Sequence, residues 1–159
     1  AKQTLYRAYV SGNQDVIEIL LQEGITLHDS HVVDAVRDGD INLLMKVVEH
    51  LKLNKNWYPH LGEYMLERYF FYPDGYSGRL RYFMNEMPCS IALYITYCKE
   101  RFDMADYLMK NKTKVTMDML QYVSKYSSQK AVARVIQNLK DTGTWDPNYN
   151  GASAALEIA

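Results

Sequence analysis

Residues 5–24 read LYRAYVSGNQDVIEILLQEG, and this stretch decides the fold. The apolar residues of its first half predict one short helix, and the apolar run 16–21 predicts a second. Gly12 separates the two helices and Gly24 ends the second, because glycine takes a positive φ at little steric cost. The stretch therefore predicts two helices joined by a tight turn.

The same helix–turn–helix design returns along the chain. Its turn positions are separated by 27, 36, 25 and 27 residues, an irregular but repeated pattern. A short helix pair cannot bury its apolar side alone, so neighbouring units are expected to stack. Within the weakest unit, helices are expected over 64–71 and 80–84. The predicted units cover residues 3–28, 32–52, 62–88, 91–113 and 118–139, with turns at Gly12, Gly39, Gly75, Glu100 and Ser127.

Stacking would join the apolar residues of successive helices into one continuous core. Three alanines, Ala8, Ala35 and Ala92, are small enough to let paired helices approach closely. An array of this kind leaves a broad concave face open for binding. The residues expected in the core are Val16, Ile19, Leu20, Leu43, Leu44, Val47, Tyr107, Leu108, Val135 and Ile136.

The first unit resembles an ankyrin repeat. That family's pattern begins T-P-L-H-x-A and continues with A-x-x-G, an apolar run and a second glycine. Near the other end of the chain, residues 146–148 and 154–159 resemble the family's D-x-N finger and the T-A-L-x-I-A start of a helix. The matching positions of the first unit are Thr4, Leu5, Ala8, Gly12, Val16, Ile17, Ile19, Leu20, Leu21, Gly24 and Ile25.

The resemblance implies an all-α fold. It is an ankyrin-like α-solenoid of stacked helix-turn-helix repeats with short or missing β-fingers, forming a single domain over residues 1–159. A partial unit at 146–159 stops inside its first helix, so we expect the parent chain to continue, or residues 154–159 to form a cap. The alternative fold is another α-solenoid, such as a HEAT-like array, which would explain the short periods but not the finger at 146–148.

Composition and charge narrow the class of protein. The 159 residues carry a formal net charge of −1, so no global attraction to nucleic acid or anionic lipid is expected. Residues 1–10 lack the apolar region of a signal peptide, and no apolar run is long enough to span a membrane. Cys89 and Cys98 are interpreted as packing residues in a reducing, intracellular setting, cytoplasmic or nuclear.

No set of residues predicts catalysis, a cofactor or a metal ion. Residues 75–79 read GYSGR and lack the final glycine of a G-x-S-x-G nucleophile turn, so they are interpreted as a surface turn. His28 and His31 lack the further ligands that zinc requires. Residues 111–113 read NKT and are interpreted as a chance match to the glycosylation pattern.

Aromatic and basic residues interleave over 52–83. The leading interpretation is that most of the aromatic rings fill the core of an irregular unit, with a partner-binding surface second. Single-stranded nucleic acid ranks third, because acidic neighbours offset the basic residues. The basic residues are Lys52, Lys55, Arg68, Arg79 and Arg81, and the aromatic ones are Trp57, Tyr58, Tyr69, Phe70, Phe71, Tyr72, Tyr76, Tyr82 and Phe83.

These observations favour a non-catalytic protein–protein interaction module that binds a partner protein or peptide. The ankyrin resemblance implies binding through the concave face and the finger tips, where Tyr, Trp and Arg are common anchors. Two alternatives stay open: a regulatory or substrate-docking segment of a larger enzyme or effector, and a domain of a transcription or chromatin regulator. We expect the chain to be part of a larger polypeptide or complex, with no direct binding of nucleic acid or membrane. The partner-binding candidates are Arg37, Asp38, Trp57, Tyr58, Tyr76, Lys99, Lys125, Tyr126 and Tyr149.

Overall fold

The computed structural model describes residues 2–62, 65–71 and 78–149, and these residues form helices and loops without any strand. The prediction of an all-α fold is therefore confirmed. The helices are α1 (Lys2–Ser11), α2 (Gln14–Gln22), α3 (His31–Asp38), α4 (Ile41–Leu53), α5 (Leu66–Phe71), α6 (Arg79–Glu86), α7 (Pro88–Cys98), α8 (Phe102–Lys110), α9 (Met117–Tyr126) and α10 (Gln129–Asp141).

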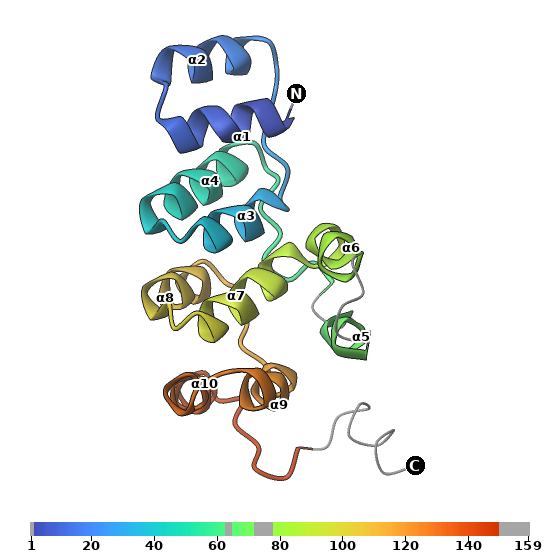
Figure 1. Ribbon diagram of the computed structural model, residues 1–159. Helices are drawn as coiled ribbons and strands as arrows, with labels where there is room; N and C mark the ends of the chain where they lie inside the picture. The colour runs from blue at the N-terminus through green and yellow to red at the C-terminus, as the bar shows by residue number, and fades with distance from the viewer. Residues whose placement is uncertain (1, 63–64, 72–77, 150–159) are drawn as a thin grey trace.

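Eight of these helices form hairpin pairs that follow one another in a row (Figure 1). The pairs are α1 with α2, α3 with α4, α7 with α8, and α9 with α10. Helix α3 packs most extensively on α7, and α4 contacts α8. The second and third pairs of the row are thus direct neighbours, although 34 residues separate the end of α4 from the start of α7 in the sequence.

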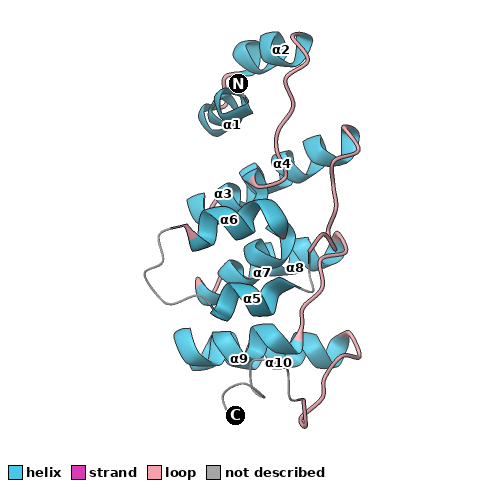
Figure 2. Ribbon diagram, turned by 90° about the vertical axis from the view of Figure 1, so that its right-hand side faces the viewer, coloured by secondary structure: helices cyan, strands magenta, loops and turns pink. Residues whose placement is uncertain are grey.

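The remaining two helices, α5 and α6, lie beside the row. Helix α6 contacts α7, and α5 contacts α9. Both lie on the side formed by the first helices of the pairs (Figure 2). The sequence placed helices at 64–71 and 80–84, close to α5 and α6, but their position covers part of the first-helix face instead of extending the stack.

The second helices of the row all end in the same backbone geometry. In each, a residue with positive φ follows the helix: Gly24, Lys55, Lys112 and Gly143, with φ of 81°, 58°, 80° and 74°. The next residue donates its N–H back to a leucine carbonyl oxygen five residues earlier, which closes a Schellman motif. These bonds are Ile25 to Leu20 at 3.2 Å, Asn56 to Leu51 at 2.8 Å, Thr113 to Leu108 at 3.0 Å and Thr144 to Leu139 at 2.9 Å.

The hairpin turns and helix starts follow from local sequence. Gly12, Gly39 and Glu100 lie in the turns with positive φ, whereas Ser127 is extended and begins its turn differently. Short polar side chains cap the following helices by accepting a backbone N–H. The predicted turn residue Gly75 lies outside the described residues. The capping side chains are Asn13 for α2, Asp40 for α4, Thr116 for α9 and Ser128 for α10.

The core runs through the row and includes most of the residues expected there. Leu43, Leu44, Val47, Leu108 and Val135 are buried, as are Ala8, Ala35 and Ala92. Val16, Leu20 and Tyr107 are half-buried against this core, and Ile136 is also half-buried. The prediction for Ile19 is wrong, because its side chain is 60% exposed. Helix α2 is the outermost helix of the row (Figure 1), and Ile19 lies on its uncovered side.

Candidate functional site

Five of the predicted partner-binding residues lie at the C-terminal ends of first helices, next to the hairpin turns. We call this set the turn edge: Arg37, Asp38, Lys99, Lys125 and Tyr126. All five side chains are exposed. They come from α3, the α7–α8 turn and α9, so the turn edge spans three successive helix pairs.

Hydrogen bonds between neighbouring turns fix the turn edge. The Lys99 ammonium donates to the carbonyl oxygen of Arg37 at 2.8 Å. The Arg101 guanidinium donates to the carbonyl oxygen of Gly39. Ser127 Oγ donates to the carbonyl oxygen of Cys98 at 3.4 Å, which links the next pair. The backbone of one turn is thereby held against the next by side chains.

Asp38 also links the first two helix pairs. The Tyr6 hydroxyl donates to Asp38 Oδ2, and the Tyr6 ring stacks on His31 at 4.9 Å. Burial raises the pKa of Tyr6, and its bond to the Asp38 carboxylate raises it further. The phenol therefore keeps its proton and remains a donor, so Asp38 has a structural partner as well as an exposed surface.

Tyr126 joins the turn edge to the aromatic residues of α5 and α7. It is 47% exposed, and Lys125 Nζ lies 5.1 Å from its ring centre. Together with Tyr69, Phe70, Arg79 and Tyr94 it lines a cavity of about 60 Å³. A recognition surface with an aromatic anchor beside cations suits protein partners.

The aromatic residues of the 52–83 stretch divide between core and surface. Tyr69 and Phe83 are buried, and Phe70 stacks on Tyr122 of α9 with ring centres 3.6 Å apart. Tyr82 is 51% exposed. The Arg79 guanidinium lies 4.7 Å from the centre of the Tyr69 ring. The rings of Tyr69, Phe70 and Phe83 thus hold α5 and α6 on the row.

The predicted finger residues form a separate group at the other end of the helices. Trp57 is half-buried, and its Nε1 donates to the carbonyl oxygen of Asn111 at 3.0 Å. Tyr58 is exposed and donates to the Lys55 carbonyl oxygen at 2.9 Å. The 13 residues of α4 separate these side chains from the turn edge by about 20 Å.

The two other candidates contribute less to the arrangement. Tyr149 is exposed, and its hydroxyl donates to Asp118 Oδ1 at 2.8 Å, which places it at the α9 end of the row. Tyr76 lies outside the described residues. The structure therefore brings five candidates together at the turn edge and leaves Trp57, Tyr58 and Tyr149 elsewhere.

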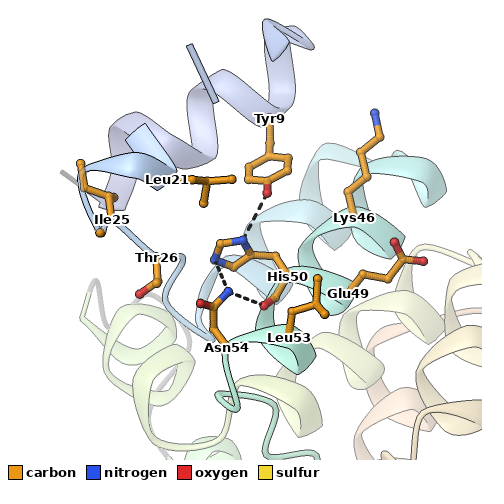
Figure 3. A pocket seen from close by; sticks show the side chains of 10 residues that line it. Tyr9, Leu21, Ile25, Thr26, Lys46, Glu49, His50, Leu53 and Asn54 are labelled. Carbon is orange, nitrogen blue, oxygen red and sulfur yellow. Dashed lines mark hydrogen bonds between the residues drawn. The ribbon is translucent and has the colours of Figure 1, made fainter. Parts of the chain in front are cut away.

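A groove of about 610 Å³ separates the first helix pair from α4 (Figure 3). Its lining includes Tyr9, Leu21, Lys46, Glu49 and His50. His50 is buried, and its Nε2 accepts the backbone N–H of Leu27 at 2.9 Å. Because Nε2 is the acceptor, the neutral ring carries its proton on Nδ1, 3.2 Å from the Tyr9 hydroxyl. Burial lowers the pKa of His50, which favours this neutral form.

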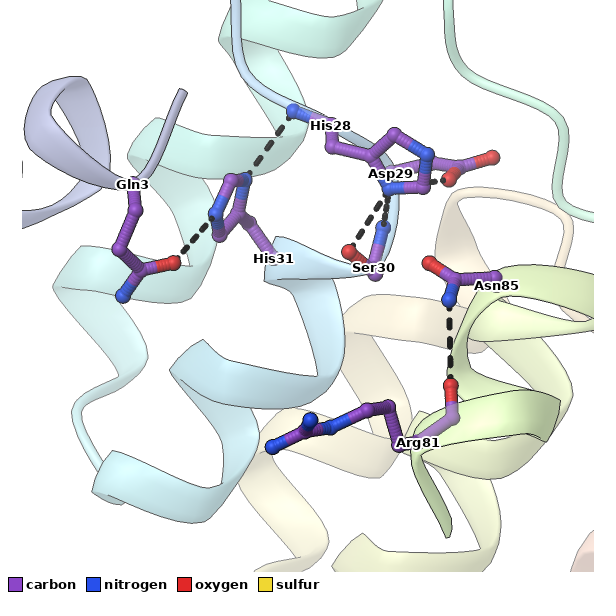
Figure 4. Close-up of polar contacts among 7 residues, drawn as sticks. All are labelled: Gln3, His28, Asp29, Ser30, His31, Arg81 and Asn85. Carbon is purple, nitrogen blue, oxygen red and sulfur yellow. Dashed lines mark hydrogen bonds and ion pairs between the residues drawn. The ribbon is translucent and has the colours of Figure 1, made fainter. Parts of the chain in front are cut away.

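A second groove, of about 520 Å³, lies between α3 and α6. Arg37, Asp34 and Ser30 line it from α3 and the residue before it, and Leu80, Arg81, Met84 and Asn85 line it from α6. Figure 4 shows the Arg81 side chain reaching from α6 towards α3. Sequence reasoning missed this groove, because nothing in the local pattern indicates that α6 packs beside α3.

The two histidines considered for metal binding already bond to protein atoms (Figure 4). His31 Nδ1 accepts the backbone N–H of His28 at 3.0 Å, and its Nε2 lies 3.2 Å from Gln3 Oε1. His28 Nδ1 lies 3.2 Å from Asp29 Oδ1. Across residues 2–62, 65–71 and 78–149, no group of three or more His, Cys, Asp or Glu side chains is placed to hold a metal ion.

Other reactive or modifiable groups are buried. Burial raises the pKa of the Cys89 thiol to about 12, so this cysteine stays protonated near neutral pH. Asn111, in the glycosylation pattern, is buried, with its Oδ1 accepting from Lys52 and its Nδ2 donating to the Tyr107 carbonyl oxygen at 2.8 Å. Its amide nitrogen is therefore engaged inside the folded protein.

Comparison with known proteins adds no relative. No family model matches the chain, and neither the curated proteins nor the solved structures contain a significant match. In the described part of the chain, no helix combines the length and apolar character needed to cross a membrane.

Proposed function

We propose that the chain is a non-catalytic protein–protein interaction module. Its row of helix pairs is an ankyrin-like α-solenoid with short fingers, and it binds a partner protein or peptide. The partner contacts the turn edge and the uncovered part of the first-helix face. Tyr58 and Tyr149 at the finger end form a secondary contact region.

The turn edge is the observation that carries this proposal. Arg37, Lys99 and Tyr126 are exposed on three successive pairs, while bonds between neighbouring turns hold their backbone in place. Side chains on a fixed backbone lose less conformational freedom when they bind. Arg and Tyr are also the residue types that most often anchor protein interfaces.

Repeated helix ends support the solenoid part of the proposal. The same Schellman closure at Gly24, Lys55, Lys112 and Gly143 gives successive pairs a common exit direction. Units with equal geometry stack by the same translation, which extends the binding surface from pair to pair.

A pull-down with the 159-residue chain, followed by mass spectrometry, tests the proposal. We expect Arg37→Ala and Tyr126→Ala each to weaken capture of the same partner at least about tenfold, because anchor residues contribute about 1.4 kcal/mol or more. Arg7→Ala, which removes an exposed arginine of α1, is the matched control and should leave capture unchanged. The melting temperature should barely move in any variant.

Two results would contradict the proposal. Unfolding of both Arg37→Ala and Tyr126→Ala would assign these residues to the core. Equal capture by wild type and both variants would show that the turn edge does not bind the partner.

A further inference from the structure

The groove between α3 and α6 contains two guanidinium groups without a partner. Arg37 lines it from α3 and Arg81 from α6. In the part of the chain that the structure describes, neither guanidinium makes a hydrogen bond or an ion pair; only the backbone carbonyl oxygens of these residues accept bonds, from Lys99 and Asn85. Both side chains are exposed, so a ligand can reach them.

The rest of the lining offers polar groups and a small apolar surface. Gln3 uses its Oε1 to meet His31, and Asn85 uses its Nδ2 to donate to the Arg81 carbonyl oxygen at 3.2 Å. Gln3 Nε2 and Asn85 Oδ1 are left as one donor and one acceptor, which can pair with the backbone of an extended peptide. Leu80 and Met84 are half-buried and present apolar atoms beside them.

Resting on the proposed function, we propose that this groove binds an acidic, extended segment of the partner protein. A Glu or Asp side chain of the partner lies between Arg37 and Arg81, and a neighbouring apolar side chain packs on Leu80 and Met84. The guanidinium group suits this role, because its fork of N–H donors matches a carboxylate in charge and shape. The volume of about 520 Å³ is within the range of known ligand pockets, about 300–1,000 Å³.

Asp34 sets the limits of this recognition. Its half-buried carboxyl lines the same groove, one helical turn before Arg37. It repels a second negative charge placed on its side of the groove. The groove therefore selects a segment with spaced acidic residues over a uniformly negative chain such as nucleic acid.

A peptide titration tests the inference. The probe is a short fluorescein-labelled peptide in which glutamate and leucine alternate, and the matched peptide has glutamine in place of every glutamate. We expect the acidic peptide to bind the full chain and the glutamine peptide to bind at least about tenfold more weakly, since a charge-assisted hydrogen bond contributes about 1.5–3 kcal/mol. Fluorescence anisotropy gives both affinities.

Variants of the chain locate the binding. Arg37→Gln and Arg81→Gln should each weaken the acidic peptide about tenfold, whereas Arg7→Gln removes the same charge elsewhere and should change affinity less than about twofold. Asp34→Asn should strengthen binding about twofold to fivefold, because it removes a repulsive charge. All four variants should unfold at nearly the wild-type urea concentration, as expected for surface substitutions.

Several results would overturn the inference. These are equal binding of the two peptides, equal losses for Arg7→Gln and Arg81→Gln, or a phosphoserine peptide that binds more than about tenfold tighter than the glutamate peptide. If the captured partner depends on Tyr126 but resists competition by the acidic peptide and is retained by Arg81→Gln, the groove assignment fails while the proposed function stands. Loss of partner capture in Arg81→Gln with restoration in Arg81→Lys would support a cation requirement at this position.

Discussion

The row of helix pairs and the α5–α6 segment are both helical, but different forces place them. In the row, α2, α4, α8 and α10 end in the same left-handed cap, so the path of the chain is defined within each pair. The segment α5–α6 consists of helices of six and eight residues. Helix α6 begins at Gly78 without a side-chain cap, so its local sequence holds it less firmly.

Long-range contacts hold α5 and α6 where local signals do not. Phe70 of α5 stacks on Tyr122 of α9, and Tyr69 packs edge-on against Phe83 and Tyr94. The comparison teaches that the row is encoded pair by pair, whereas the position of α5–α6 depends on aromatic contacts with distant helices. The groove proposed to bind an acidic segment exists only because α6 lies beside α3.

The largest effect is expected in the leucines that close the helix ends of the row. Leu51 is 0% exposed and its carbonyl oxygen accepts the Asn56 N–H. Leu51→Ala should lower the free energy of unfolding by about 2–5 kcal/mol, because it opens a cavity in the core. Leu53→Ala, two residues along the same helix and 84% exposed, should change it by less than about 0.5 kcal/mol. Urea unfolding followed by circular dichroism measures both, and similar losses in the two variants would contradict the core assignment.

A smaller and more local effect is expected at Gly62, which precedes the α5–α6 segment. Its φ is +67°, and a Cβ there would lie 2.1 Å from the carbonyl oxygen of Glu86 at the end of α6. Gly62→Ala should therefore cost about 2–3 kcal/mol, from left-handed strain and the close contact. Gly143→Ala is the matched control, since φ is +74° but nothing lies within 4 Å of the added Cβ.

Hydrogen exchange separates the two glycine variants by location. In Gly62→Ala, the amides of α5 and α6 should exchange faster while those of α10 keep wild-type protection. In Gly143→Ala, the increase should be confined to the end of α10. Equal protection of α6 in Gly62→Ala and wild type would show that the contact with Glu86 does not hold this segment.

The sequence contains the spacing of the row, but at positions that are hard to recognise. The positive-φ residues Gly24 and Lys55 are 31 residues apart, as are Lys112 and Gly143, whereas Lys55 and Lys112 are 57 apart. The excess in the middle interval corresponds to the α5–α6 segment. Counting from the hairpin turns gave shorter and less even steps, because lysine at two of the four helix ends does not indicate a left-handed residue.

Helix type and most core residues were predictable because they depend on local pattern. Ile19 was wrong, since exposure at the end of a row depends on whether a neighbour covers it. The turn edge was predictable for a similar reason: residues next to a hairpin turn are exposed in any helix pair. The groove between α3 and α6 was not, because Arg37 and Arg81 are 44 positions apart and meet only through the packing of α6.

A pH-dependent effect should appear in the joint between the first two pairs. His50 is buried as a neutral acceptor of the Leu27 N–H, and burial lowers its pKa below the value of about 6.5 expected in the unfolded chain. The unfolded state therefore binds a proton that the folded state resists, and stability should fall as pH drops below about 6.5. Tyr9, Lys46 and Glu49 face the same groove.

Urea midpoints measured between pH 8 and pH 5 test this effect. His50→Gln should be less stable than wild type at pH 8 and should show a flatter pH dependence, because glutamine does not titrate. His60→Gln, at an exposed position, should retain the wild-type slope. A His50→Gln slope equal to that of wild type would exclude His50 as the source of the acid sensitivity.

The smallest effect is expected from matching the lysine helix ends to the glycine ones. Lys112 has φ of 80°, which strains an L side chain by about 1–2 kcal/mol, whereas glycine adopts it freely. Lys112→Gly also adds about 0.5–1 kcal/mol of chain entropy to the unfolded state, so the net gain in stability should be about 0.5 kcal/mol. Lys114→Gly is the control, because Lys114 has no positive φ and should lose stability on the same change. If both substitutions destabilise equally, then the left-handed residue at this helix end carries no strain, and the lysine and glycine caps of the row are energetically equivalent.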